Sequence, residues 1–218
     1  MDGVPLDTYC ETQRLPLAKR LHLFRQVCAA VGYAHRRLVI HRDIKCRNIL
    51  VTSEGTPKLL DFGIAKLLDR SGLGGQTRTG QRAFTLEHAS PEQIRGEPMA
   101  VTSDVYALGV LLYQLLTGQR PCGSTAVTDT DVMRAICEDP PSRPTDAARS
   151  GTGFAVSPEL EWILLKAIRK GLNTATSRWI NWTTTSIDWR QAGRCWPGPT
   201  RGGIARASSS PGTGRCCR

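Results

Sequence analysis

Three stretches of the chain carry apolar residues in patterns that are typical of helices. In residues 15–36 they return every third or fourth position among Arg and Lys, a pattern that predicts an amphipathic helix with one buried face. Residues 102–118 are apolar on nearly every side and end at Gly118, which predicts a helix that is buried all round and stops at glycine. Residues 158–170 show the amphipathic pattern again, and Pro158 fits the first turn of a helix.

Two short runs of strand type lie between the first two of these helices, at residues 48–52 and 57–60. The turn Ser53-Glu54-Gly55-Thr56 separates them, and this arrangement predicts a β-hairpin. Because the two ends of a hairpin lie side by side, Asn48 and Asp61 are expected to be neighbours.

The rest of the pattern adds little β structure. Residues 38–40 form a short apolar run that is expected to anchor the following loop on a buried element. Residues 69–81 are polar and rich in glycine, as mobile loops are. Residues 121–153 alternate loop with one short helix, expected at 129–138. The predicted fold class is therefore mainly α, with one small hairpin.

Polar residues that can carry chemistry gather on both sides of the hairpin. His41-Arg42-Asp43 comes first, with Lys45 and Asn48 close behind it, and Asp61-Phe62-Gly63 follows the second strand. Phosphoryl transfer to a hydroxyl needs a carboxylate that accepts the hydroxyl proton, oxygen ligands for Mg²⁺ and a cation near the transferring group. Asp43 can supply the carboxylate and Lys45 the cation. Asn48 and Asp61 can supply the metal ligands.

In this order and at this spacing, the motifs resemble the C-terminal lobe of bacterial eukaryotic-like (Hanks-type) serine/threonine protein kinases. The resemblance covers roughly residues 2–170. It implies a helical lobe whose small hairpin carries the catalytic loop, 41–48, and the Asp-Phe-Gly turn, followed by an activation segment, 61–92. It also implies ATP and Mg²⁺ as cofactors and a Ser or Thr of a protein as the acceptor. Lys45 would contact the γ-phosphate, and a Lys there is typical of Ser/Thr rather than Tyr kinases.

The resemblance gives structural or regulatory roles to further residues. Asp104 would hold the backbone of the turn formed by His41 and Arg42, although its position also fits an acid favoured by the helix dipole. The guanidinium of Arg42 would pair with a phosphate group on the activation loop. Glu92, in the motif Ser-Pro-Glu, would pair with an arginine later in the chain.

Three threonines of the activation segment also receive roles by resemblance. Thr85 would hydrogen-bond near Asp43 and Lys45 in the loop that docks the substrate. Thr77 and Thr79 are the natural acceptors of a regulatory phosphate, and ordinary loop threonines would fit the same pattern.

The sequence departs from the family pattern in several places. Cys46 stands where many members have Pro, and Leu86 and His88 replace the usual Pro and Tyr of the docking segment. None of these changes removes a catalytic group. A kinase N-terminal lobe supplies a glycine-rich loop, a strand Lys and a helix Glu. The 42 residues before Asp43 contain none of these features, so the N-terminal lobe is expected to be missing.

Residues 171–218 differ from the rest of the chain. They lack helical periodicity and carry seven Arg and one Asp, which is +6 of the net charge of +10. Read from the third base of each codon, the stretch can encode an acidic amphipathic helix with the arginine that Glu92 needs. We therefore expect a kinase C-lobe fragment over 1–170 and a non-homologous, frameshifted and disordered tail over 171–218. A stop codon in the third-base frame of the DNA would contradict the frameshift.

Composition narrows the class of partner and the location. Outside the tail there are 22 basic and 18 acidic residues, so no nucleic-acid partner is expected. The eight cysteines show no metal-ligand spacing, which favours reduced thiols and a cytoplasmic location. No apolar stretch is long enough to span a membrane. The sequence does not indicate an oligomeric state.

Two other functions remain open at this point. The chain could be a non-catalytic, truncated kinase fragment. It could also be a small-molecule phosphotransferase of the aminoglycoside-kinase type, which shares the His-x-Asp, Asn and Asp logic. That family typically has Gly rather than Arg after the His, and it lacks an activation segment that ends in Ser-Pro-Glu.

Overall fold

The computed structural model describes residues 2–60, 86, 88–152 and 154–170. The predictions for Asp61, Thr77, Thr79, Thr85 and the tail over 171–218 lie outside these residues. The described elements, in chain order, are β1 (Val4–Pro5), α1 (Leu6–Thr12), α2 (Leu17–His35), the 3-10 helix η1 (Cys46–Asn48), β2 (Ile49–Val51), β3 (Pro57–Leu59), α5 (Pro91–Ile94), α6 (Val101–Thr117), α7 (Asp129–Glu138), α8 (Pro144–Ser150) and α9 (Pro158–Ala167). The described part is mostly helical, as predicted.

The sheet contains the predicted hairpin and one further strand. β2 and β3 pair antiparallel, with Ile49 opposite Leu59, and Gly55 takes a φ of +77° in the connecting turn. β1 adds to the outer side of β2, so the order is β1-β2-β3. The sequence analysis missed β1 because a two-residue strand that contains a proline has no detectable alternation.

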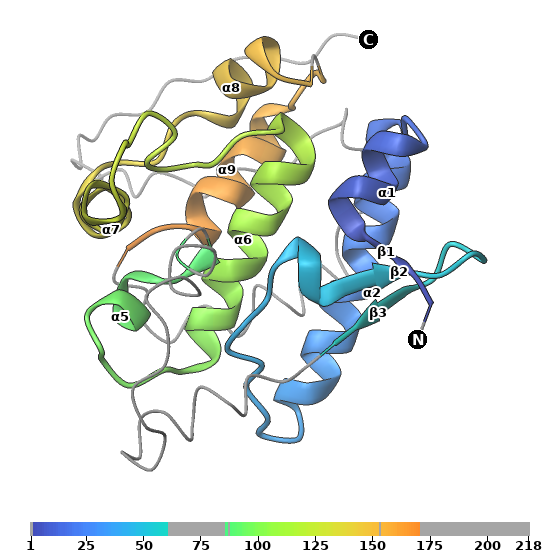
Figure 1. The fold of residues 1–218 in the computed structure, drawn as a ribbon, viewed down its shortest axis with the longest axis horizontal. Coiled ribbons are helices and arrows are strands. Elements are labelled where there is room, and N and C mark those ends of the chain that lie inside the picture. Colours follow the sequence, from blue (N-terminus) through green and yellow to red (C-terminus); the bar gives the residue numbers. More distant parts are fainter. Residues whose placement is uncertain (1, 61–85, 87, 153, 171–218) are drawn as a thin grey trace, which may run out of the picture.

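Helix α6 is the centre of the structure. Figure 1 shows it in green, with α2 on one side and α8 and α9 on the other, and it contacts all three. Nearly all of its side chains are buried, and Gly118 ends it in the left-handed conformation with a φ of +69°. The prediction of a helix buried all round is therefore confirmed.

Helix α9 crosses α6 at very short range. A Cβ atom on Gly109 would lie 2.7 Å from Cγ2 of Ile168 and 2.8 Å from Cβ of Ala167. These separations are shorter than real Cβ contacts, so a glycine is needed at this crossing. The predicted apolar face of α9 is confirmed, since Leu160, Ile163, Leu164, Ala167 and Ile168 are all buried.

The long helix α2 also agrees with the pattern. It runs from Leu17 to His35, slightly shorter than the predicted 15–36, and it packs on α6 and β3. Helix α7 has the predicted bounds, with the Thr128 hydroxyl capping its first turn.

Two expectations about less regular stretches are wrong. Residues 121–153 contain a second helix, α8, which has too few apolar residues to show a period. The run over 38–40 does not anchor the loop in the core, because Leu38 is 93% exposed and Val39 is 43% exposed. The loop is held instead by polar contacts of the residues that follow. Apolar character alone was therefore misleading here, since single exposed apolar residues are common on proteins.

Two further observations concern the described part as a whole. None of its helices combines the length and the apolar character needed to cross a bilayer. Its cysteines are free thiols, namely Cys10, Cys28, Cys46, Cys122 and Cys137.

Candidate active site

The loop before η1 makes a sharp turn at His41 and Arg42, and Asp104 holds it. The backbone N–H groups of His41 and Arg42 donate to Oδ2 and Oδ1 of Asp104, each at 2.8 Å. Asp104 comes from the first turn of α6, and its side chain is 1% exposed. The contact implied by the family resemblance is thus present in the structure.

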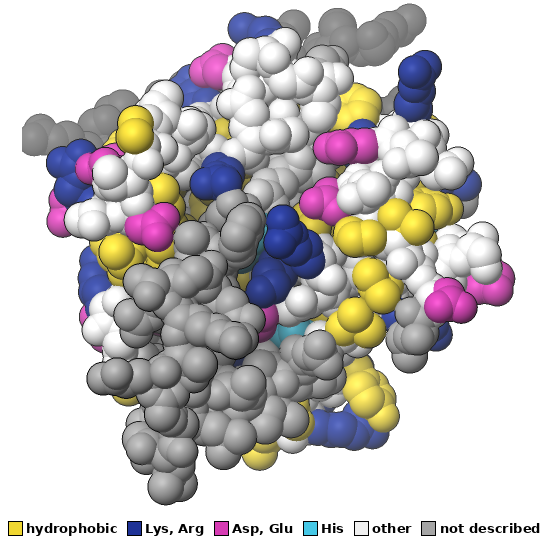
Figure 2. Space-filling model, viewed as in Figure 1, with side chains coloured by type: hydrophobic (Ala, Val, Ile, Leu, Met, Phe, Trp, Pro, Cys, Tyr) yellow, Lys and Arg dark blue, Asp and Glu magenta, His cyan; other side chains and the backbone are white. Residues whose placement is uncertain are grey.

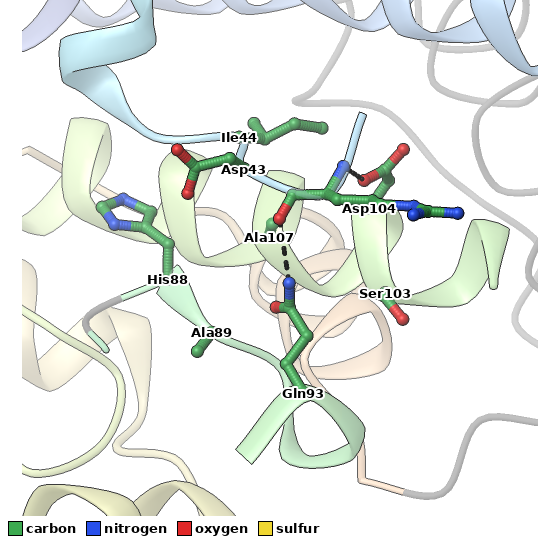
Figure 3. Close-up of a pocket in the computed structure, with 9 residues that line it drawn as sticks. Asp43, Ile44, His88, Ala89, Gln93, Ser103, Asp104 and Ala107 are labelled. Carbon is green, nitrogen blue, oxygen red and sulfur yellow. Dashed lines mark hydrogen bonds between the residues drawn. The ribbon is translucent and has the colours of Figure 1, made fainter. Parts of the chain in front are cut away.

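Arg42 is in the left-handed region, with a φ of +70°. That conformation is unfavourable for a residue with a Cβ atom, so it persists only where the surroundings impose it. Gln93 of α5 supplies part of the restraint, because its Nε2 donates to the carbonyl of Arg42 at 2.9 Å. Figure 3 shows Gln93 reaching this carbonyl while Asp104 holds the N–H of the same residue.

His35, at the end of α2, adds a third donor to the Asp104 carboxylate. Its Nε2 lies 2.7 Å from Oδ2, and because a carboxylate only accepts, Nε2 carries the proton. Sequence reasoning missed this residue. The two side chains are 69 positions apart, and no local pattern links them.

His41 connects the turn to the end of the hairpin. Its ring is buried, and Nε2 lies 2.9 Å from the carbonyl of Leu60, while Nδ1 faces the N–H of Asp43 at 3.3 Å. A carbonyl accepts and an N–H donates, so the ring carries its proton on Nε2. His41 therefore ties Asp43 to the residue that precedes Asp61.

Asp43, Lys45 and Asn48 come together as the motif predicts. Lys45 Nζ lies 2.9 Å from Oδ2 of Asp43, and Asn48 Nδ2 donates to the same oxygen at 2.8 Å. Asn48 Nδ2 also donates to the Asp43 carbonyl at 2.8 Å. Figure 2 shows a group of Lys and Arg side chains near the centre of this face.

These two contacts fix the orientation of the Asn48 amide. Both partners are acceptors, so the NH₂ group must face Asp43, and Oδ1 must point elsewhere. An amide oxygen suits Mg²⁺, which prefers oxygen ligands. The backbone of Leu60 donates to the Asn48 carbonyl at 2.8 Å, so the chain returns to Asn48 one residue before Asp61. Shared ligation by Asn48 and Asp61 stays a prediction.

Short helix α5 contacts the turn at Arg42 through Gln93. Ser90 caps it, and the side chains and backbone of Ser90 and Gln93 form a capping box. Oε1 of Glu92 accepts a hydrogen bond from the Ser103 hydroxyl at 2.6 Å. The pairing of Glu92 with an arginine stays a prediction.

Two departures from the family pattern lie close to Asp43. Cys46 is buried, and burial raises the pKa of its thiol, so it is an inert packing group. The ring of His88 lies beside the Asp43 side chain (Figure 3). Burial is the main cause that lowers the pKa of His88 to about 4; Lys45 and Arg120 lower it further, while Gln114 and Asp43 act in the opposite direction.

Comparisons with known proteins agree with this arrangement. A family model described as "Protein kinase domain" matches residues 1–169. The chain is 35% identical over 188 residues to a probable serine/threonine-protein kinase PknB of Lactococcus lactis, and the match covers 74% of this chain and 29% of that protein. It is 37% identical over 177 residues to serine/threonine-protein kinase PknB of Mycolicibacterium smegmatis, and that match covers 78% of this chain and 26% of the relative.

A third relative is serine/threonine-protein kinase PknA of Mycobacterium tuberculosis, 39% identical over 148 residues that cover 67% of this chain and 33% of that protein. The matches with these three relatives thus cover about a quarter to a third of each relative's length. The family is nevertheless clear, because its model covers most of the sequence and the catalytic-loop residues lie together in the fold. The chain belongs to the protein kinase family.

Proposed function

We propose that this chain carries the catalytic groups of a serine/threonine protein kinase, which transfers the γ-phosphate of ATP to a Ser or Thr hydroxyl of a protein. One observation carries the proposal: Lys45 and Asn48 both contact Oδ2 of Asp43, at 2.9 and 2.8 Å. This arrangement joins the three groups that phosphoryl transfer needs at one place.

Each group has a distinct role in the reaction. Asp43 accepts the proton of the substrate hydroxyl as the new O–P bond forms and the bond between the γ-phosphorus and the leaving ADP oxygen breaks. Lys45 stabilises negative charge on the transferring group. Asn48 and Asp61 would hold Mg²⁺, which neutralises phosphate charge when it is bound.

We further propose that residues 1–170 form the C-terminal lobe of the kinase domain and that 171–218 lie outside it. The mostly helical content of the described part, the position of the catalytic loop within it and the family match over 1–169 support this division. In such a lobe the proton acceptor and the metal ligands are present, whereas the glycine-rich loop belongs to the other lobe.

Regulation and location are also proposals. Arg42 would receive a phosphate carried by Thr77 or Thr79, and Thr85 would align the substrate near Asp43. The free thiols of the described cysteines support a reducing, cytoplasmic location.

The test is phosphotransfer from Mg²⁺-ATP by the full chain, with a mixture of Ser- and Thr-containing peptides as acceptors. Asp43→Asn is expected to lower the rate at least about 100-fold, since it removes the proton acceptor. Asp146→Asn, the same change at a side chain that is 68% exposed, is the matched control and should leave the rate unchanged.

The outcome separates the alternatives. Equal rates for the unmodified chain and Asp43→Asn would contradict the proposal and favour a non-catalytic fragment. Phosphorylation of an aminoglycoside but of no peptide would favour the small-molecule phosphotransferase.

A further inference from the structure

A small hollow lies between the catalytic loop, α5 and α6. Asp43, His88, Gln93, Asp104 and Ala107 are among the residues that line it, and it has room for about one water molecule. Most of these side chains are polar, and polar cavities of this size hold ordered water, whereas apolar ones stay dry. The hollow is therefore suited to a bound water.

His88 brings an unsatisfied atom to this region. Its Nε2 is shielded from solvent, and no described residue forms a hydrogen bond with it. A buried polar atom without a partner is unfavourable, so native proteins usually satisfy it with protein or water. Figure 3 shows the His88 ring beside the Asp43 carboxylate, which makes Asp43 the natural second partner of a bridging water.

Burial, more than the charges around the ring, keeps His88 neutral near pH 7. Lys45 and Arg120 disfavour a positive charge on it, and burial disfavours that charge more strongly. A hydrogen bond between the ring and the Gln114 side chain favours the charge, as does the Asp43 carboxylate, but together they do not outweigh burial. A neutral ring can still exchange one hydrogen bond with a water through Nε2, as donor or acceptor according to its tautomer.

We propose that His88 is a positioning residue for phosphoryl transfer, which acts by holding, together with Asp43, one water molecule in this hollow. The water donates to the Asp43 carboxylate and bonds to Nε2 of His88, so it adds a restraint on the carboxylate to those from Lys45 and Asn48. The role in transfer rests on the proposed function, whereas the water bridge itself does not. The family pattern usually has Tyr at this position.

Kinetics of two variants test the positioning role. His88→Phe keeps a ring but removes both nitrogens, and kcat should fall about tenfold, because small misplacements of a reacting group are costly. KM for ATP should stay unchanged. His88→Gln places an amide near the position of Nε2, and it should retain kcat to within about threefold. Circular dichroism checks that both variants fold.

A spectroscopic readout tests the bridge without any need for activity. The ¹⁵N chemical shifts of the His88 imidazole, assigned by their loss in His88→Phe, should change in Asp43→Asn. Exchange cross-peaks between water and the His88 ring should also be seen. Unchanged shifts in Asp43→Asn, together with no ordered water at the hollow in a crystal structure, would overturn the inference.

The two proposals can fail separately. If the unmodified chain transfers phosphate and His88→Phe matches its kcat, the positioning role is wrong and the kinase function stands. If the chain transfers no phosphate, the proposed function fails, and the role in transfer fails with it. The ¹⁵N shifts then still decide whether the water bridge exists.

Discussion

The turn at His41 and the crossing of α6 with α9 are both buried, yet they are held by opposite means. One carboxylate, Asp104, collects three donors at the turn, from two backbone N–H groups and the His35 ring. At the crossing, Gly109 lets the apolar side chains of Ala167 and Ile168 approach closely. The polar contacts of the turn fix the orientation of the backbone at His41 and Arg42, whereas the crossing stabilises the fold by burying apolar surface.

This difference has a consequence for mutation. A hydrogen-bonded centre fails when one group changes its donor or acceptor character, even if its shape is preserved. An apolar crossing fails when volume is added, even if polarity is preserved. Isosteric and polarity-preserving substitutions therefore separate the two kinds of support.

The largest effect is expected from Asp104→Asn. The amide preserves the shape, but its NH₂ group faces donors that need an acceptor, and the buried charge that three donors stabilise is lost. We expect the free energy of unfolding to fall by about 3 kcal/mol. Urea denaturation measures it, and Asp146→Asn is the exposed control. A loss below about 0.5 kcal/mol would mean that the turn does not depend on the carboxylate.

Adding one methyl group at the crossing is the complementary test. Gly109→Ala should lower the free energy of unfolding by about 2 kcal/mol, because Ile168 and Ala167 must move. Gly96→Ala is a useful contrast, because a Cβ there meets nothing within 4 Å and only the φ of +72° opposes it. Equal losses for the two variants in urea denaturation would show that close packing at α9 is not the cause.

The free energy of unfolding should also depend on pH through His88, which lies beside Asp43. The pKa of His88 is about 4 in the folded chain and ordinarily 6.5, so the unfolded chain binds this proton more tightly. The stability that His88 contributes is therefore complete above pH 6.5 and is lost as the pH falls toward 4. The loss is on the order of 2 kcal/mol.

The matched variant for this prediction is His88→Gln, which cannot titrate. Urea denaturation of both proteins from pH 7 to pH 4 should show a steeper loss for the unmodified chain. Parallel curves would mean that the ring is not shielded. Gly109→Ala should shift the stability by the same amount at every pH, since the substitution neither adds nor removes a titratable group.

The same two regions explain what could be predicted from the sequence. A continuous apolar run identified α6 and an amphipathic period identified α9, because apolar packing leaves its pattern in the local sequence. The spacing of Asp43, Lys45 and Asn48 predicted that these side chains lie together, because they are only five positions apart at most, and the structure places Lys45 and Asn48 against Asp43. The roles of His35 and Gln93 could not be found, because their hydrogen-bond partners, Asp104 and Arg42, lie 69 and 51 positions away.

The loop that leads into the turn offers the smallest test. Leu38 and Arg42 both have left-handed backbones, with φ values of +61° and +70°. Asp104 and Gln93 impose this conformation on Arg42, whereas the Leu38 side chain is 93% exposed. Arg42 is thus held in this conformation by the side chains of Asp104 and Gln93, whereas the side chain of Leu38 is exposed. A glycine at position 38 should therefore relieve the backbone strain there.

Leu38→Gly is accordingly expected to raise the free energy of unfolding by about 0.5–1 kcal/mol, the relief of left-handed strain less the greater entropy of glycine in the unfolded chain. Arg14→Gly, at an exposed position with a φ of 46°, should give a similar gain. Arg42→Gly relieves the same kind of strain but loosens the turn that Asp104 and Gln93 hold, so phosphotransfer should fall while stability changes little. A loss of stability in Leu38→Gly would show that the exposed leucine supports the loop after all.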